Sequence, residues 1–174
     1  HAALFPTGFS GLVRIKVGGW RADATGPMQV VSGPPGRQRV HFEAPPADAL
    51  ESETRRFLTW ANSASTEPPL IKAGLAHLWF VTLHPFDDGN GRIARALTDL
   101  ALAQGEGQSI RFYAMSSAIL ADRKGYYREL ECAQRFSSAD TTPDITPWLH
   151  WFFATLLAAL EGALAQIDRV LGKS

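Results

Sequence analysis

The sequence contains a single cysteine and no excess of charge of either sign. Because Cys132 has no second cysteine to pair with, an internal disulfide and a cysteine-based zinc cluster are both excluded. A lone thiol is typical of a reducing compartment, and we expect the protein to be cytoplasmic. The 17 Lys and Arg residues balance 17 Asp and Glu residues, so the formal charge is zero and nucleic-acid binding is not expected.

Long apolar runs are also missing. The most apolar stretch, Trp148 to Leu160, has about 13 residues, whereas a helix needs about 20 to span a bilayer. We therefore expect no membrane association. No basic segment followed by an apolar one opens the chain, so the sequence shows no signal peptide. Because the chain starts at His1 rather than at a methionine, we expect it to be a fragment of a longer protein.

The composition is that of a folded globular protein. Hydrophobic residues make up 45% of the 174 positions and charged residues 20%, which argues against disorder. This length predicts one domain, residues 1–174, large enough to bury a core without disulfide or metal support.

Glycine, proline and short β-prone runs characterise the first 48 residues. Residues 28–31 and 37–42 flank the turn-forming segment 32–36, which predicts a β-hairpin over 28–42. A two-stranded hairpin is marginally stable in water, so it should lean on helices or pair with a partner.

From Pro46 onward, apolar residues recur at helical spacing. The predicted helices cover residues 50–61, 69 to just before Pro85, 90–105, 115–135 in one or two pieces, and 147–171. The last should begin with Thr146 as its N-cap and Pro147 in the first position. The predicted fold class is therefore all-α with one short β-hairpin near the N-terminus.

The segment between the second and third predicted helices contains an unusual set of residues. Residues 84–95 read His-Pro-Phe-Asp-Asp-Gly-Asn-Gly-Arg-Ile-Ala-Arg. Gly89 and Gly91 allow successive backbone N–H groups to point into one concavity, and a helix starting at Asn90 directs its positive dipole end there. This arrangement predicts an anion-binding site.

The charged residues of this segment indicate what the anion is. Arg92 and Arg95 are three residues apart on one helix, so they share a face and suit neighbouring phosphates. Asp88 would be repelled by phosphates unless it holds a divalent cation such as Mg²⁺. His84 is mostly neutral at pH 7 and can accept a proton. Each feature alone is common in turns and on surfaces, but their convergence at one helix start favours a nucleotide site.

Residues 84–95 match the signature of the Fic family at every specified position. That signature is His, any residue, Phe, any residue, Asp or Glu, Gly-Asn-Gly-Arg, any two residues and Arg. The segments 76–80, 40–46 and Tyr126-Tyr127 extend the resemblance over nearly the whole chain. The resemblance implies a compact helical bundle that carries residues 28–42 as a β-hairpin flap.

The resemblance also implies an activity. Most Fic proteins are protein adenylyltransferases, which move AMP from ATP to a Ser, Thr or Tyr hydroxyl of a target protein and release pyrophosphate. By this resemblance His84 is the catalytic base, and Asp88 holds Mg²⁺ between the α- and β-phosphates. The implied phosphate-binding residues are Gly89, Asn90 on the α-phosphate, Gly91, and Arg92 and Arg95 on the outer phosphates.

Contacts outside the motif follow from the resemblance as well. Tyr126 and Gln134 fall where family members contact adenosine, although Gln134 replaces a residue that is often Asn. The flap residues Val40, His41 and Phe42 are implied to dock the target through main-chain pairing. Such pairing names neither the target protein nor its modified residue, and the oligomeric state stays open.

Many relatives are silenced by a helix with the pattern Ser or Thr, three residues, Glu, then Gly or Asn. Glu106-Gly107 and Glu161-Gly162 both have leucine four residues before the glutamate, so neither pair matches. We expect a restraining helix, if this protein has one, to lie upstream of His1. Two alternatives remain: removal of AMP or transfer of another phosphoryl-type group, and a nucleotide-binding interaction module without turnover.

Overall fold

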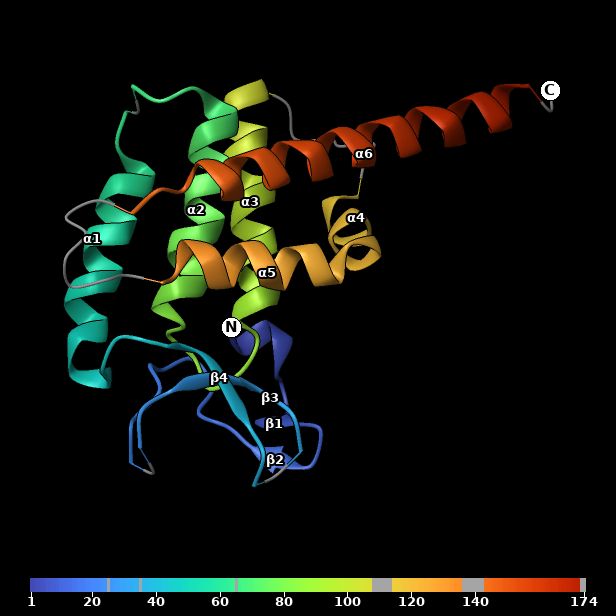
Figure 1. Ribbon diagram of the computed structural model, residues 1–174. Helices are drawn as coiled ribbons and strands as arrows, with labels where there is room; N and C mark the ends of the chain where they lie inside the picture. Colours follow the sequence, from blue (N-terminus) through green and yellow to red (C-terminus); the bar gives the residue numbers. More distant parts are fainter. Residues whose placement is uncertain (25, 35, 65, 108–113, 136–142, 173–174) are drawn as a thin grey trace. The chain divides into compact units, whose positions relative to one another are not determined.

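The computed structural model describes residues 1–24, 26–34, 36–64, 66–107, 114–135 and 143–172 (Figure 1). Within these residues the chain forms six α-helices, two β-hairpins and two short 3-10 turns. The helices are α1 (Leu50–Asn62), α2 (Pro69–Leu83), α3 (Asn90–Glu106), α4 (Met115–Ala121), α5 (Arg123–Ala133) and α6 (Thr146–Leu171). The fold class is therefore mostly helical with a small hairpin near the N-terminus, as the sequence predicts.

The chain divides into two compact units. The first contains His1–Thr66 and Ala76–Leu97, and the second contains Glu67–Leu75 and Thr98–Ser174. The boundaries fall inside α2 and α3, so each of these helices contributes to both units. Whether residues 1–174 form one domain stays a prediction.

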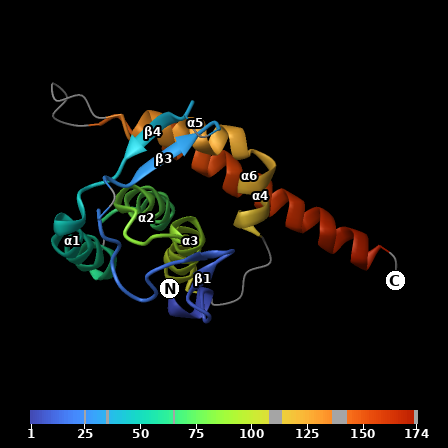
Figure 2. The same cartoon turned by 90° about the horizontal axis from the view of Figure 1, so that it is seen from below.

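Both hairpins belong to the first unit. The smaller pairs β1 (Phe9–Ser10) with β2 (Val13–Arg14). The larger pairs β3 (Gln29–Ser32) with β4 (Arg39–Glu43), and Figure 2 shows these strands side by side. Val30 faces Phe42 and Val31 faces Val40, so His41 has no opposite residue and forms a β-bulge. The hairpin predicted over 28–42 is confirmed, although residue 35 of its turn lies outside the described residues.

Aromatic side chains join α1 and α2 in the first unit. Phe57 of α1 is 1% exposed and packs edge-on against Trp79, with ring centroids 5.6 Å apart. It also contacts Phe80 at 5.9 Å. These rings bury the apolar face that the helical spacing of α1 predicts.

The second unit is built around α6, against which α4 and α5 pack. Trp148 and Phe152 are fully buried, and the Trp148 Nε1–H donates to the Gly74 carbonyl at 3.0 Å. A Cβ at Gly74 would lie 3.0 Å from the Leu149 side chain, so the backbone approaches α6 closely here. The C-terminal part of α6 runs on past α4 (Figure 1), and Leu164 and Leu171 are exposed there.

The start of α6 differs from the prediction. Thr146 is the first helical residue rather than the N-cap, and the capping position is Ile145, which makes no side-chain cap bond. Asp144 accepts the Thr146 backbone N–H through Oδ1 at 2.9 Å. Asp144 therefore satisfies the N–H of the first helical residue, which an N-cap threonine would not have done, since an N-cap accepts from residues two or three positions further on.

Helix α6 has its predicted length to within one residue, but it meets a criterion for membrane spans that its 13-residue apolar stretch did not indicate. By length and composition its 26 residues could span a membrane, and 39% of its most apolar window is buried inside the structure. Core helices of soluble proteins meet the same criterion. The expectation of no membrane association therefore stays a prediction.

Candidate active site

The loop between α2 and α3 is closed by one side chain of its own. Asn90 is 3% exposed, and its Oδ1 accepts the Phe86 N–H at 3.0 Å while its Nδ2 donates to the Phe86 carbonyl at 2.8 Å. Both polar groups of the amide are therefore used within the loop. Contact of Asn90 with the α-phosphate stays a prediction, because Nδ2 has a second N–H beyond the one that the Phe86 carbonyl accepts.

Only one of the two motif glycines has a backbone conformation that requires glycine. Gly89 has φ +84°, and a Cβ there would lie 2.8 Å from the Phe5 ring. Gly91 lies in the first turn of α3 and is not among the glycines with positive φ. The special backbone geometry expected of both glycines is therefore found at Gly89 alone.

His84 follows the last residue of α2 and has a left-handed backbone conformation. Its φ is 46°, and it is the one non-glycine residue with positive φ in the described part of the chain. This conformation costs an L-residue about 1–2 kcal/mol. The His84 N–H donates to the Phe80 carbonyl at 3.1 Å, continuing the hydrogen bonding of α2.

The imidazole of His84 is oriented by a backbone carbonyl. Its Nδ1 lies 3.3 Å from the Val81 oxygen. Because a carbonyl can only accept, Nδ1 carries the proton in this contact, and Nε2 of the neutral ring is left unprotonated. Burial lowers the pKa of His84 from 6.5 and Arg21 lowers it further, against opposing effects of Val81 and Asp88. The ring is thus a neutral proton acceptor at pH 7.

Asp88 is held as an anion beside His84. The Ser10 hydroxyl donates to its Oδ2, and the Gly89 N–H donates to its Oδ1 at 2.5 Å. These bonds, chiefly that from Ser10, lower the Asp88 pKa. Arg92 lies 3.9 Å from Oδ2, but both side chains are nearly half exposed, so this ion pair contributes little stability.

Asp88 has the chemistry required of a magnesium ligand, but it stands alone. The described residues include no cluster of three or more His, Cys, Asp or Glu side chains able to hold a metal ion. Mg²⁺ commonly takes one or two carboxylates and completes its coordination with phosphate oxygens and water. The residues present therefore fit this ion when a polyphosphate accompanies it.

The two motif arginines lie on the first turns of α3. The Arg92 guanidinium lies 4.5 Å from the centre of the Phe5 ring, a cation–π contact. Arg95 is partly buried and close enough to His77 to lower the pKa of that histidine. Both cations thus lie within the first two turns of α3.

Several residues near the motif carry no sequence signal that would have identified them. His1 stacks on Phe86 with ring centroids 4.1 Å apart, and its Nε2 contacts the Asp88 carbonyl at 3.1 Å. Arg21 is fully buried and donates to the His84 carbonyl. These residues lie in the irregular N-terminal region, where neither helical nor strand periodicity indicates which side chains turn inward.

The flap residues are partly accessible. Val40 is 48% exposed, whereas His41 and Phe42 are intermediate. The His41 Nε2 and the Ser32 hydroxyl are 2.6 Å apart, which joins the bulge to β3. Target docking on this hairpin stays a prediction.

The predicted adenosine contacts belong to the second unit. Tyr126 is 6% exposed and contacts the Tyr127, Trp148 and Trp151 rings. Gln134 caps α5, and its N–H donates to the Leu130 carbonyl. The motif lies in the first unit, and the contact of Tyr126 and Gln134 with adenosine stays a prediction.

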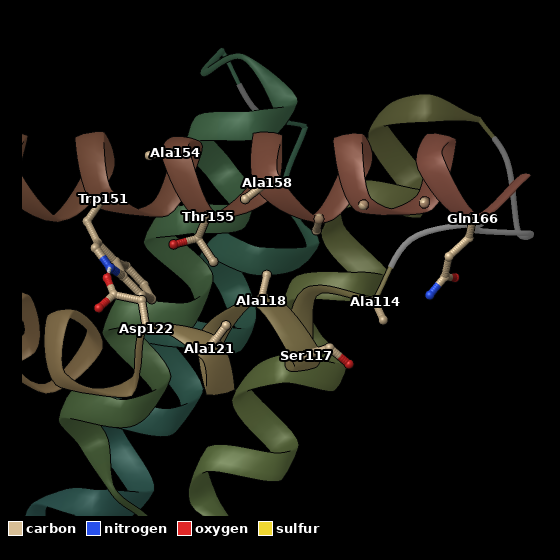
Figure 3. A pocket seen from close by; sticks show the side chains of 13 residues that line it. Ala114, Ser117, Ala118, Ala121, Asp122, Trp151, Ala154, Thr155, Ala158 and Gln166 are labelled. Carbon is tan, nitrogen blue, oxygen red and sulfur yellow. Dashed lines mark hydrogen bonds between the residues drawn. The ribbon is translucent and has the colours of Figure 1, made fainter. Parts of the chain in front are cut away.

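A pocket of about 700 Å³ lies between α4 and α6 of the second unit (Figure 3). Alanines line most of it, and Asp122 and Trp151 stand together at one end, where the indole N–H donates to the carboxylate at 2.7 Å. None of the predicted site residues lines this pocket. It offers no histidine or cation for the chemistry that the motif indicates.

Solved structures share this fold. A Fic family protein from Desulfovibrio desulfuricans G20 superposes with a TM-score of 0.71 at 28% sequence identity, over 97% of this chain and 46% of that one. A Fic-domain signaling protein from Bacteroides thetaiotaomicron VPI-5482 gives a TM-score of 0.62 at 24% identity, over 87% of this chain and 57% of that one.

Curated relatives carry the name "Protein adenylyltransferase Fic". The Nematostella vectensis protein is 37% identical over 132 residues, which are 73% of this chain and 27% of the relative. The Drosophila melanogaster protein is 44% identical over 64 residues, 36% of this chain and 13% of the relative. The chain thus spans about a quarter or less of these relatives. The Fic/DOC family model matches residues 1–102, more than half of the chain, and the chain belongs to this family.

Proposed function

We propose that this protein is a protein adenylyltransferase, which transfers AMP from ATP to a Ser, Thr or Tyr hydroxyl of a target protein. One observation carries the proposal: a neutral histidine lies close to the N-terminus of a helix. The Val81 carbonyl orients the His84 ring, and α3 begins six residues later at Asn90, whose side chain closes the connecting loop. The names of the curated relatives support the same reaction class.

In the proposed reaction, His84 Nε2 accepts the proton of the target hydroxyl. The hydroxyl oxygen attacks the α-phosphorus, and the bond from that phosphorus to the bridging oxygen of the β-phosphate breaks. Pyrophosphate leaves with the electron pair of that bond. Burial supports the role of His84, because it lowers the pKa of the ring and keeps it unprotonated before the attack.

The backbone N–H groups of Gly89, Asn90 and Gly91 are proposed to bind phosphate oxygens, helped by the dipole of α3. Arg92 and Arg95 are proposed to neutralise the outer phosphates, and Tyr126 and Gln134 to contact adenosine. Asp88 would hold Mg²⁺, which when bound neutralises charge on the departing pyrophosphate. The hairpin at Val40, His41 and Phe42 would present the target. A cytoplasmic location is part of this proposal, and the absence of a second cysteine is consistent with a reducing compartment.

The test follows labelled phosphate from ATP to protein. The chain is incubated with Mg²⁺, a cell extract and ATP labelled at the α-phosphate, beside His84→Ala. A matched control is His150→Ala, which removes an exposed histidine of α6. We expect labelled protein with the unchanged chain and with His150→Ala, and none with His84→Ala.

Other outcomes identify the alternatives. Label that reaches protein only from γ-labelled ATP would mean phosphorylation, and loss of label from protein already carrying AMP would mean removal of AMP. Tight ATP binding with no label from either position would favour a binding module. Asp88→Asn tests the metal assignment: transfer that persists unchanged at ordinary Mg²⁺ would show that Asp88 does not hold the ion.

A further inference from the structure

Arg21 is a buried cation that no motif accounts for. Its side chain is 0% exposed, and each of its guanidinium nitrogens has an acceptor. Nε donates to the His84 carbonyl at 2.8 Å, NH1 pairs with Asp23 Oδ1 at 2.5 Å, and NH2 donates to the Pro45 carbonyl. Burying a guanidinium is costly unless its charge and donors are matched, so this arrangement constrains all three partners.

The bond to His84 acts on the main chain of the proposed base. Phe80 holds the His84 N–H, and Arg21 holds the His84 carbonyl. The Arg21 backbone N–H also donates to the Pro85 carbonyl at 3.0 Å. The peptide groups on both sides of the His84 Cα are therefore fixed, and with them the direction in which the imidazole leaves the backbone. A left-handed conformation at a non-glycine residue persists only where its surroundings impose it.

The remaining bonds reach the base of the hairpin. Pro45 follows β4 by two residues, and the Ala44 N–H donates to the Met28 carbonyl beside it. Asp23 uses its second oxygen to accept the Ala47 N–H at 2.6 Å. One ion pair, in which the arginine is buried and Asp23 is partly exposed, thus connects the histidine to the segment that anchors the β3–β4 hairpin.

We propose that Arg21 is a positioning residue, which holds His84 in its left-handed conformation and ties it to the base of the β3–β4 hairpin. Its effect on catalysis rests on the proposed function, since it presumes that His84 is the base. Its effect on structure does not depend on any activity.

The first test is amide hydrogen exchange in Arg21→Lys, which keeps the charge but lacks the planar fork of three donor nitrogens. We expect exchange to rise several-fold in residues 84–91, proline excepted, and at Ala44 and Ala47, the two residues of segment 44–47 that have an amide hydrogen, because both segments lose the same anchor. The control is Arg55→Lys, which changes an exposed arginine of α1 paired with Glu51. Unchanged exchange in either segment of Arg21→Lys would overturn the proposal.

The second test separates positioning from a general structural role. In Arg21→Lys we expect kcat to fall about tenfold or more, while the dissociation constant for ATP with Mg²⁺ changes little, since misplacing a reactive group chiefly slows the chemical step. An unchanged kcat per folded molecule would overturn this part of the proposal. If the unchanged chain shows no transfer, the proposed function fails, and hydrogen exchange still decides the role of Arg21.

Asp23→Asn serves if Arg21→Lys does not fold. It removes the negative partner but leaves the two carbonyl acceptors in place. We expect a smaller rise in exchange in both segments, because asparagine has no charge and only one accepting oxygen for two donors, Arg21 NH1 and the Ala47 N–H. No rise in either segment would contradict the proposal.

Discussion

Replacing Gly89 by alanine should destabilise the protein for two separable reasons. The φ of +84° costs an alanine about 1–2 kcal/mol relative to glycine. In addition, the new Cβ would lie 2.8 Å from the Phe5 ring, which is only 4% exposed and cannot easily move. Overpacking of this kind typically costs about 1–3 kcal/mol. We therefore expect a loss of about 2–5 kcal/mol in the free energy of unfolding.

Gly8→Ala provides the matched control. Gly8 has nearly the same φ, +80°, but a Cβ there would have no atom within 4 Å. It should lose only the backbone contribution, about 1–2 kcal/mol. Urea unfolding of both variants measures the two losses, and their difference is the steric contribution of Phe5.

The steric argument makes a further claim about Phe5. Phe5→Leu should cost less in the Gly89→Ala background than in the unchanged chain, because the smaller side chain relieves the collision. If Gly89→Ala and Gly8→Ala are equally destabilising, the Phe5 ring yields freely and the reasoning is wrong.

Three further predictions concern the motif and its neighbours. The acid limb of the pH–rate profile for transfer should have its midpoint below pH 6.5, because burial lowers the pKa of His84 from that value; a midpoint at or above pH 6.5 would contradict this. Asn90→Asp should be destabilising by about 1–3 kcal/mol in urea unfolding, because the carboxylate can accept the Phe86 N–H but cannot donate to the Phe86 carbonyl; unchanged stability would contradict the loop geometry. Burial, and secondarily Arg95, lowers the pKa of His77 to about 3. Below pH 6.5 this histidine therefore binds a proton in the unfolded chain but stays neutral in the folded chain. His77 alone should therefore make the free energy of unfolding about 2 kcal/mol smaller at pH 5 than at pH 7, and His77→Gln should reduce the slope by this amount; an equal slope would rule out His77 as a source.

Helices were predictable from the sequence because their signals are local. The apolar spacing of α1 and the proline at Pro69 set the first helices within a residue or two of their observed bounds. Residues 115–135 were left open as one helix or two, and the structure breaks them at Asp122, which caps α5 by accepting the Gly125 N–H. The capping prediction at Thr146 was wrong by one position: the helix begins at Thr146, whose own N–H is bound by Asp144.

The candidate site was only partly predictable. The motif spacing predicted that His84, Asp88 and the start of α3 lie close together, because a chain of six residues has a short reach. The same pattern did not show that the Asn90 side chain is used within the loop. Nor could it show that Ser10 and Arg21 reach the motif from 63 or more residues away, because the irregular N-terminal region has no periodicity that assigns its side chains to a face.

The two halves of the candidate site differ in contact order. On the phosphate side, the closure of the loop by Asn90 and Phe86 spans only four residues and costs little chain entropy, but Asp88 also depends on Ser10, 78 residues away. The histidine side depends on Arg21, across a loop of 63 residues. In mild denaturant the contacts of Ser10 and Arg21 should open before the loop that Asn90 closes, so the proposed base and metal ligand should lose their positions while the start of α3 keeps its own.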